Sequence, residues 1–256
     1  MKHFAFAAAT TLLCAALFGA AAAKDIPYNI KAGIDNSQRK EENRARDEGR
    51  KPGEVLAFYG VEEDMTVADL AAGGGYFTEI LSGVVGPDGK VIAHYPTNPR
   101  FEENRAALEA QFAPFGNIEI TTAATGEPFP IEDDSVDIVL LSLIAHHLHY
   151  AEDSGEEMPS NSARAYNEIK RILKPGGVFA IIEHTAAPGS TRAQSAAWHR
   201  APEDIIKADV TSVGFEFAGA ADDIHMNPED DLKNNFFESG LRGKTTRMVH
   251  KYISPE

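Results

Sequence analysis

Apolar residues follow two different periods along most of the chain, and the two periods alternate. Short apolar runs such as 65–70 and 135–143 are typical of strands buried on both faces. Between them, apolar residues recur every three or four positions, as at Phe77, Ile80 and Val84, which predicts amphipathic helices. The predicted strands are 65–70, 90–94, 118–121, 135–143, 178–182, 215–220 and 246–253, and the predicted helices are 52–59, 77–84, 101–112, 166–173 and 202–213.

The alternation of strands and helices defines a fold class. A helix between consecutive strands allows right-handed crossovers, which place the strands in parallel in one sheet with helices on both faces. We therefore predict an α/β protein with a Rossmann-like, seven-stranded, mainly parallel sheet. No repeat or low-complexity linker divides it, so we expect one domain over 51–256. The charged residues of 24–50 predict a solvated N-terminal arm or helix in front of it.

The first 23 residues have the composition of a secretory signal peptide. Lys2 and His3 precede an uncharged stretch over 4–20, and three alanines at 21–23 supply the small residues of a cleavage site. A retained membrane anchor is the alternative, but an alanine-rich stretch is only weakly hydrophobic. We expect cleavage before Lys24 and a periplasmic or secreted protein.

The balance of charges argues against polyanionic partners. The 256 residues include 24 Lys and Arg against 39 Asp and Glu, a formal net charge of −15. This charge repels nucleic acid and anionic lipid, so we expect neither nucleic-acid binding nor stable membrane insertion after cleavage. The single cysteine, Cys14, lies in the predicted signal peptide. The mature chain therefore has no thiolate to serve as nucleophile or metal ligand.

A glycine cluster follows the first predicted strand. Asp69 lies near the end of that strand, and Gly73, Gly74 and Gly75 lead into the next predicted helix. Glycine permits a sharp turn and a close approach of ligand to backbone, and the helix start presents free N–H groups. This arrangement indicates a nucleotide-type ligand. A dinucleotide-dependent oxidoreductase and a methyltransferase both use such a loop.

Further motifs favour the methyltransferase. The segments that carry this resemblance are Asp69-x-Ala71-x-Gly73-Gly74-Gly75, 127–139, His146-His147-Leu148 and 168–177. Together they resemble class I S-adenosylmethionine-dependent methyltransferases over residues 53–253. Shorter segments, such as Ile182-Glu183-His184 and Trp198-His199-Arg200, are similar to a bacterial group of exported proteins assigned as methyltransferases. The resemblance implies an antiparallel last strand and S-adenosylmethionine as cofactor.

The resemblance also implies which residues bind the cofactor. They are Asp69, Ala71, Gly73, Gly74, Gly75, Tyr95 and Asn98. Ala71 replaces a glycine of the family motif, and we expect it to be tolerated through a negative φ. Tyr95 stands where relatives have an acid for the ribose hydroxyls, so its hydroxyl or Asn98 is expected to take that role by hydrogen bonding.

Three histidines are predicted to border the methyl acceptor. His184 follows the fifth predicted strand and is the candidate general base, with His147 and His199 beside it. Packing is the competing role for each of them. A metal site of His146, His147 and His149 with Glu152 and Asp153 is conceivable, but the spacing is not a recognised ligand pattern. We therefore predict no metal.

The predicted function is S-adenosylmethionine-dependent methyl transfer to a small-molecule acceptor that the sequence does not identify. An exported methyltransferase-like binding protein without catalysis is the first alternative. Its motivation is that the cofactor is made in the cytoplasm, whereas an exported chain is threaded unfolded and cannot carry it. A nucleotide-dependent oxidoreductase is the second alternative. The sequence leaves the oligomeric state open.

Overall fold

The computed structural model describes residues 25–148, 157–238 and 240–256. The predicted signal peptide over 1–23 lies outside the described residues. So do His149, Glu152 and Asp153 of the metal site that the sequence analysis considered.

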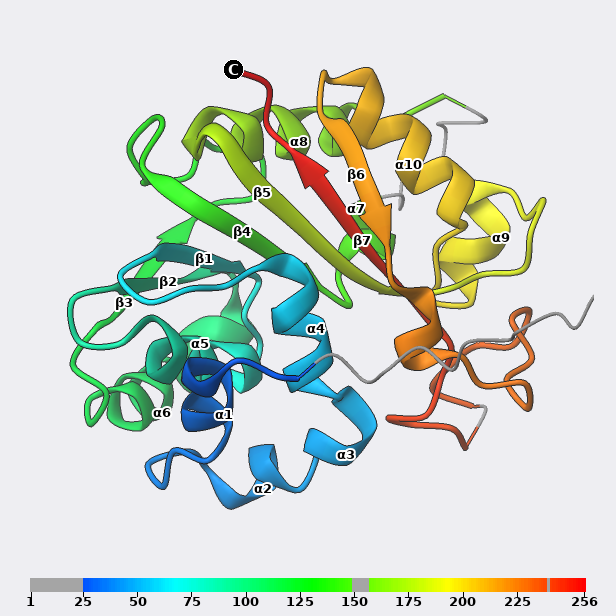
Figure 1. Cartoon of the computed structure of the whole chain (residues 1–256). Helices are drawn as coiled ribbons and strands as arrows, with labels where there is room; N and C mark the ends of the chain where they lie inside the picture. The colour runs from blue at the N-terminus through cyan, green and yellow to red at the C-terminus, as the bar shows by residue number, and fades with distance from the viewer. Residues whose placement is uncertain (1–24, 149–156, 239) are drawn as a thin grey trace, which may run out of the picture.

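Seven strands form one sheet in the order β3-β2-β1-β4-β5-β7-β6 (Figure 1). The strands are β1 (Thr66–Leu70), β2 (Lys90–Pro96), β3 (Ile118–Ala123), β4 (Val136–Ser142), β5 (Leu173–His184), β6 (Glu216–Ala220) and β7 (Arg247–Ile253). Strands β1 to β5 pair in parallel, whereas β7 pairs antiparallel with both β5 and β6. The predicted Rossmann-like sheet with an antiparallel last strand is therefore confirmed.

Helices cover both faces of this sheet. They are α1 (Tyr28–Ile34), α2 (Glu41–Arg44), α3 (Asp47–Arg50), α4 (Pro52–Tyr59), α5 (Tyr76–Val85), α6 (Pro99–Phe112), α7 (Ala145–Leu148), α8 (Ser160–Ile172), α9 (Arg192–Ala197) and α10 (Glu203–Ser212), with a 3-10 turn η1 (Asp222–His225). Figure 1 shows α1, α4 and α5 on one side of the sheet and α8 and α10 on the other. Alternate residues of each strand therefore face different helices.

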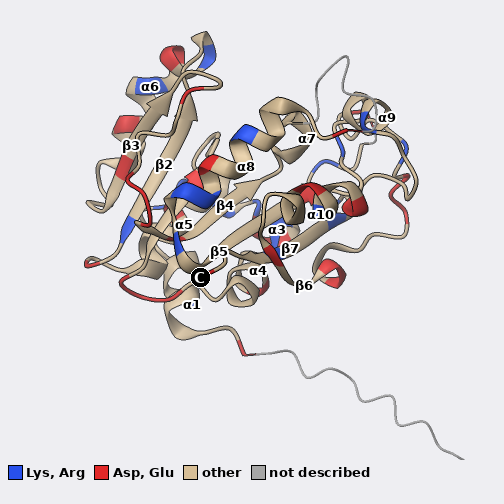
Figure 2. Cartoon of the chain, turned by 90° about the horizontal axis from the view of Figure 1, so that it is seen from above, with Lys and Arg blue, Asp and Glu red and all other residues tan. Residues whose placement is uncertain are grey.

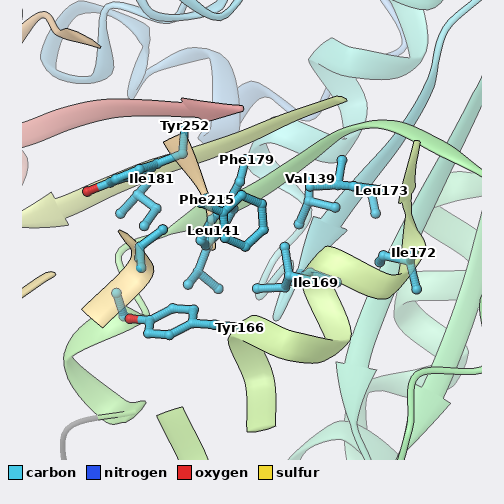
Figure 3. Packing of buried hydrophobic residues seen from close by; sticks show 14 of the residues in the cluster. Val139, Leu141, Tyr166, Ile169, Ile172, Leu173, Phe179, Ile181, Phe215 and Tyr252 are labelled. Atoms are coloured by element: carbon cyan, nitrogen blue, oxygen red, sulfur yellow. The ribbon is translucent and has the colours of Figure 1, made fainter. Parts of the chain in front are cut away.

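The face under α8 and α10 carries the larger apolar cluster. Tyr166, Ile169 and Ile172 of α8 point at side chains of β4, β5 and β7 (Figure 3). These three helix residues have exposed fractions of 0 to 1%. Complete burial of one such side chain contributes about 1.5–3 kcal/mol, so this packing fixes the position of the sheet's centre.

The N-terminal segment differs from the solvated arm that its charge predicts. Ile30 of α1 is fully buried, and α1 packs against α5. The two helices approach closely at Gly33, where an added Cβ would lie 2.6 Å from Cγ2 of Val84. Asn43 of α2 is buried and donates from Nδ2 to Glu79 Oε2 of α5 over 2.8 Å. The apolar residues before 35 and this buried amide hold the segment on the domain.

Charged residues are spread over the molecule rather than gathered on one kind of element. Figure 2 shows acidic residues on helices and loops, interspersed with basic ones. No helix among the described residues combines the length and the apolar character that crossing a membrane requires.

Candidate active site

The glycine loop occupies the turn between the end of β1 and the start of α5. Gly73 and Gly75 have φ values of +58° and +74°, in the left-handed region that favours glycine. An added Cβ would meet only Ala71 O, at 3.9 Å, at Gly73 and no atom within 4 Å at Gly74, so the backbone there faces open space. The expectation of a negative φ at Ala71 is wrong, because its φ is +52°. Ala71 therefore adopts the left-handed conformation that favours glycine, and the loop is strained there.

Asp69 is buried beneath this loop. Thr78 Oγ1 of α5 donates to Asp69 Oδ2 over 2.7 Å, which ties the end of β1 to the first turn of the helix. Burial raises the pKa of Asp69 from 3.8 to about 6, against the opposing effect of the Thr78 hydrogen bonds. Asp69 thus holds the loop in position from below.

Tyr95 and Asn98 lie at the end of the neighbouring strand β2. Tyr95 is 4% exposed and stacks on Phe101, with ring centroids 4.9 Å apart. Its buried hydroxyl has no hydrogen-bond partner among the described residues. Asn98 caps α6, because its Oδ1 accepts from Phe101 N over 2.9 Å. A buried hydroxyl without a partner next to an open glycine loop fits a nucleoside whose ribose supplies the missing partner.

A cleft of about 1110 Å³ lies beside the loop. Its walls come from α2 and α3, from the segment that follows β4, from the end of β5, and from the segment between β6 and β7. In Figure 1 these walls are the blue α2 and α3 and the orange-to-red segment before β7. Arg247 Nη1 joins the two walls by donating to Gly49 O over 3.2 Å.

Four arginines line this cleft: Arg46, Arg50, Arg242 and Arg247. None of them forms an ion pair with a carboxylate of the described residues. Burial, followed by repulsion from Arg46 and Arg247, lowers the pKa of Arg50 to about 9. Burial also lowers the pKa of Arg247 to about 10. The cleft lining therefore carries an excess of positive charge, because four arginines and two lysines stand against Glu42, Glu48 and Glu229, although the whole chain is strongly acidic.

These arginines border the glycine loop as well as the cleft. The Arg50 guanidinium lies 4.3 Å from the ring centroid of Tyr76, the residue that directly follows Gly75. Arg50 therefore links the cleft to the start of α5, directly after the loop.

His184 lines the same cleft from the end of β5. Its Nδ1 lies 2.7 Å from Thr245 Oγ1, and its ring stacks on Phe236 with centroids 4.2 Å apart. Burial lowers the pKa of His184 to about 3, which keeps the imidazole neutral at neutral pH and makes it a weak base.

The other two predicted histidines, His147 and His199, lie together with His146. His146 and His147 line the cleft, and His199 packs against them. Ring centroids of His146 and His147 are 4.2 Å apart, and those of His147 and His199 are 5.9 Å apart. Partial desolvation is the largest influence on His147, whose side chain is still exposed, and lowers its pKa to about 4. Nδ1 of His146 lies 3.0 Å from Oε2 of the fully buried Glu183.

The pair of His146 and Glu183 was not predicted from the sequence. One signal for it was present, because Glu183 lies at the end of a buried strand and burial of a carboxylate costs free energy unless the carboxylate has a partner. Burial acts to raise the pKa of Glu183, but interactions with His146 and His184 outweigh it and lower the pKa.

Arg200 follows His199, but its side chain stabilises the fold and does not line the cleft. Its side chain is fully buried and forms two bonds of 2.9 and 2.7 Å with Asp230. It also donates to Thr185 O and Asn234 O. This ion pair fixes the segment that carries Phe236 against the end of β5.

Comparison with known proteins places this site in a class. Residues 68–181 match the family model of a methyltransferase domain. The chain is 27% identical over 186 residues to the ubiquinone/menaquinone biosynthesis C-methyltransferase UbiE of Enterobacter sp. (strain 638), covering 71% of this chain and 68% of that protein.

Solved structures share the fold. A SAM-dependent methyltransferase from Aquifex aeolicus superposes with a TM-score of 0.57 at 19% identity, covering 88% of this chain and 96% of the other. The [4+2]-cyclase SpnF superposes with a TM-score of 0.55 at 13% identity, covering 86% of this chain and 85% of the other.

The methyltransferase-domain match over residues 68–181 and the similarity to UbiE agree with the fold and the glycine loop. Together they support an S-adenosylmethionine-dependent methyltransferase, with S-adenosylmethionine as its cofactor.

Proposed function

We propose that this enzyme methylates a small acceptor that carries an anionic group and binds in the cleft. The observation that supports this proposal is the set of four cleft arginines, none of which forms an ion pair with a carboxylate in the part of the chain that the structure describes. Cations held at such close range are stabilised by an anion, and arginine forms strong bidentate bonds with carboxylates and phosphates. A ligand of that charge would lower the repulsion that Arg50 experiences.

The residues predicted from the sequence divide between holding the cofactor and holding the acceptor. Bound S-adenosylmethionine supplies an electrophilic methyl group on a sulfonium centre. Asp69 orients the loop through Thr78, Gly73 and Gly74 offer an unobstructed backbone, and Tyr95 offers its hydroxyl to the ribose. The second donor for the ribose is the side-chain amide of Asn98.

His184 borders the acceptor in this proposal. Its neutral imidazole accepts a hydrogen bond from the acceptor and receives a proton if the attacking atom must lose one. A base of such low pKa suits an acceptor whose attacking atom ionises easily. The UbiE relative is named as an enzyme of ubiquinone and menaquinone biosynthesis, so intermediates of that biosynthesis form one set of acceptors to test.

Export remains part of the proposal. The leader-like composition of 1–23 supports a periplasmic or secreted enzyme. The competing function is a methyltransferase-like binding protein without catalysis. The [4+2]-cyclase SpnF illustrates that this fold supports other activities.

The decisive first experiment is calorimetric titration of residues 24–256 with S-adenosylmethionine, S-adenosylhomocysteine and NAD. We expect S-adenosylmethionine and S-adenosylhomocysteine to bind and NAD not to bind. Release of S-adenosylhomocysteine is then measured across acceptors, each acid being paired with its neutral methyl ester. We expect kcat/KM to favour the acid by about 10–100-fold, the range of one charge-assisted bond. Cofactor binding without turnover of any acceptor would favour the binding protein.

A variant separates the acceptor's charge from the cofactor's own carboxylate. Arg50→Gln should remove most of the preference for the acid while leaving cofactor affinity unchanged. Arg105→Gln is the matched control, because Arg105 lies on α6 and pairs with Glu102 over 2.8 Å. Suppose instead that Arg50→Gln weakens S-adenosylmethionine but not methylthioadenosine, which lacks the amino acid. The arginines would then serve the cofactor, contrary to the proposal.

A further inference from the structure

Three histidines from two distant segments converge on one point, and two of them, His146 and His147, line the cleft. His146 and His147 come from α7, directly after β4, and His199 follows α9. One ring nitrogen from each lies within 4.8 Å of the other two. The backbone of His199 has a φ of +52°, a conformation that a histidine adopts only at a cost. The fold therefore holds this imidazole in place against local strain.

A buried carboxylate fixes the orientation of one of these rings. Glu183 Oε2 accepts from the His146 backbone N–H over 3.0 Å and lies 3.0 Å from His146 Nδ1. Because Nδ1–H donates to the carboxylate, the lone pair of the ring is on Nε2. Histidines that bind metals characteristically donate their other ring N–H to a carboxylate in this way.

We propose that His146, His147 and His199 bind one divalent transition-metal ion of the kind that prefers imidazole, such as Zn²⁺. Three imidazole ligands leave a fourth coordination position open, as in catalytic zinc sites. His146 and His147 also line the cleft, so that position faces the space assigned to the acceptor. The metal site itself does not depend on the proposed function.

This inference departs from the prediction of no metal for a structural reason. The spacing of His146 and His147 alone is no ligand pattern, and the third ligand lies 52 residues further along the chain. The end of α9 brings it there. Aromatic packing explains part of the arrangement, since His199 contacts Phe237 with centroids 4.9 Å apart. Packing alone needs neither converging nitrogens nor a carboxylate on His146.

The test is a direct measurement of metal binding. Tag-free protein of residues 24–256 is stripped with a chelator and titrated with Zn²⁺ by calorimetry and with Co²⁺ by visible absorption. We expect one ion per chain and a cobalt spectrum of low coordination number with nitrogen ligands. His147→Ala should weaken Zn²⁺ by at least about 100-fold, and Glu183→Gln by about 10-fold, the lower end for a supporting carboxylate.

The controls make each outcome decisive. His147 is exposed, so its alanine variant should fold, and circular dichroism checks this. Glu203→Gln is the matched control, because Glu203, Asp222 and His250 form a second group of potential ligands. It should leave Zn²⁺ affinity unchanged. Absence of a stoichiometric ion, or equal affinity in His147→Ala and the parent protein, would overturn the proposal. So would loss of the ion in Glu203→Gln alone.

Discussion

At the scale of single residues, Ala71 shows how the glycine loop tolerates a substitution at the expense of stability. A left-handed torsion costs a non-glycine residue about 1–2 kcal/mol of folding free energy, and replacement by glycine removes this cost. Part of the gain is lost because glycine makes the unfolded chain more flexible. We predict that Ala71→Gly stabilises the protein by about 0.5–1 kcal/mol, measured as an increase in Tm. The φ of +52° is the reason. A lower Tm would contradict this account.

Gly74→Ala is the complementary change in the same loop. An added Cβ at Gly74 meets no atom within 4 Å, so Tm should remain unchanged. Weaker S-adenosylmethionine binding in this variant would show that the open space belongs to the ligand.

Asp69 makes stability depend on pH. Its pKa is raised from 3.8 to about 6 by burial, so the folded chain keeps a proton that the unfolded chain releases. The contribution of Asp69 to the free energy of unfolding therefore falls as pH rises from about 4 to 6 and is constant above pH 6. Asp69→Asn, which stays neutral, should gain up to about 3 kcal/mol over the parent above pH 6 and nothing below pH 4. Melting curves across pH measure the difference, and a gain that grows toward low pH would have the wrong sign.

His184→Ala tests the acceptor side of the site. Turnover should fall by about 100-fold, the lower end for a proton-transferring group, because the pKa of about 3 makes this imidazole a weak base. Cofactor affinity should stay the same. His184→Gln, which keeps a hydrogen-bond acceptor, should recover part of the loss if orientation is the main contribution. Loss of cofactor affinity would place His184 in the cofactor pocket.

At the scale of elements, the long apolar strands could be predicted from the sequence because burial on both faces leaves a continuous apolar run. The helices α7 and α9 could not, since four and six residues are too few to show a period. The same limit affects the site. His146 meets Glu183 only because β4 and β5 pair in the register that brings Ser142 beside Ile182. Such a contact depends on pairing rather than on spacing along the chain.

The Arg200–Asp230 pair shows how one element holds another. Both side chains are fully buried, so removal of one partner leaves an uncompensated charge. We predict that Arg200→Ala destabilises the protein by about 3–5 kcal/mol. Denaturant unfolding measures this loss. Arg171→Ala is the control, because Arg171 pairs with Glu168 and Asp133 at a partly exposed site and should cost less. Equal losses would show that burial is not the cause.

At the scale of the whole molecule, the expected export decides where the enzyme meets its cofactor. Protein purified from its native host should begin at or near Lys24 and fractionate with the periplasm or the medium. Amino-terminal sequencing and fractionation beside a cytoplasmic marker check both points. An intact Met1 in the cytosol would contradict the signal peptide and remove the problem of cofactor supply.

The contact of Arg247 with Gly49 joins residues 198 positions apart, and the strand that carries Arg247 is both last in the chain and interior to the sheet. The two arginine-bearing walls therefore meet only after β7 has been synthesised and has joined the sheet. A truncated copy lacks an inner strand as well as one wall of the cleft, and its unpaired sheet edges attract proteases and aggregation. We therefore expect ligand binding in the cleft only in copies that contain β7, so the order of the strands along the chain excludes shorter copies from binding.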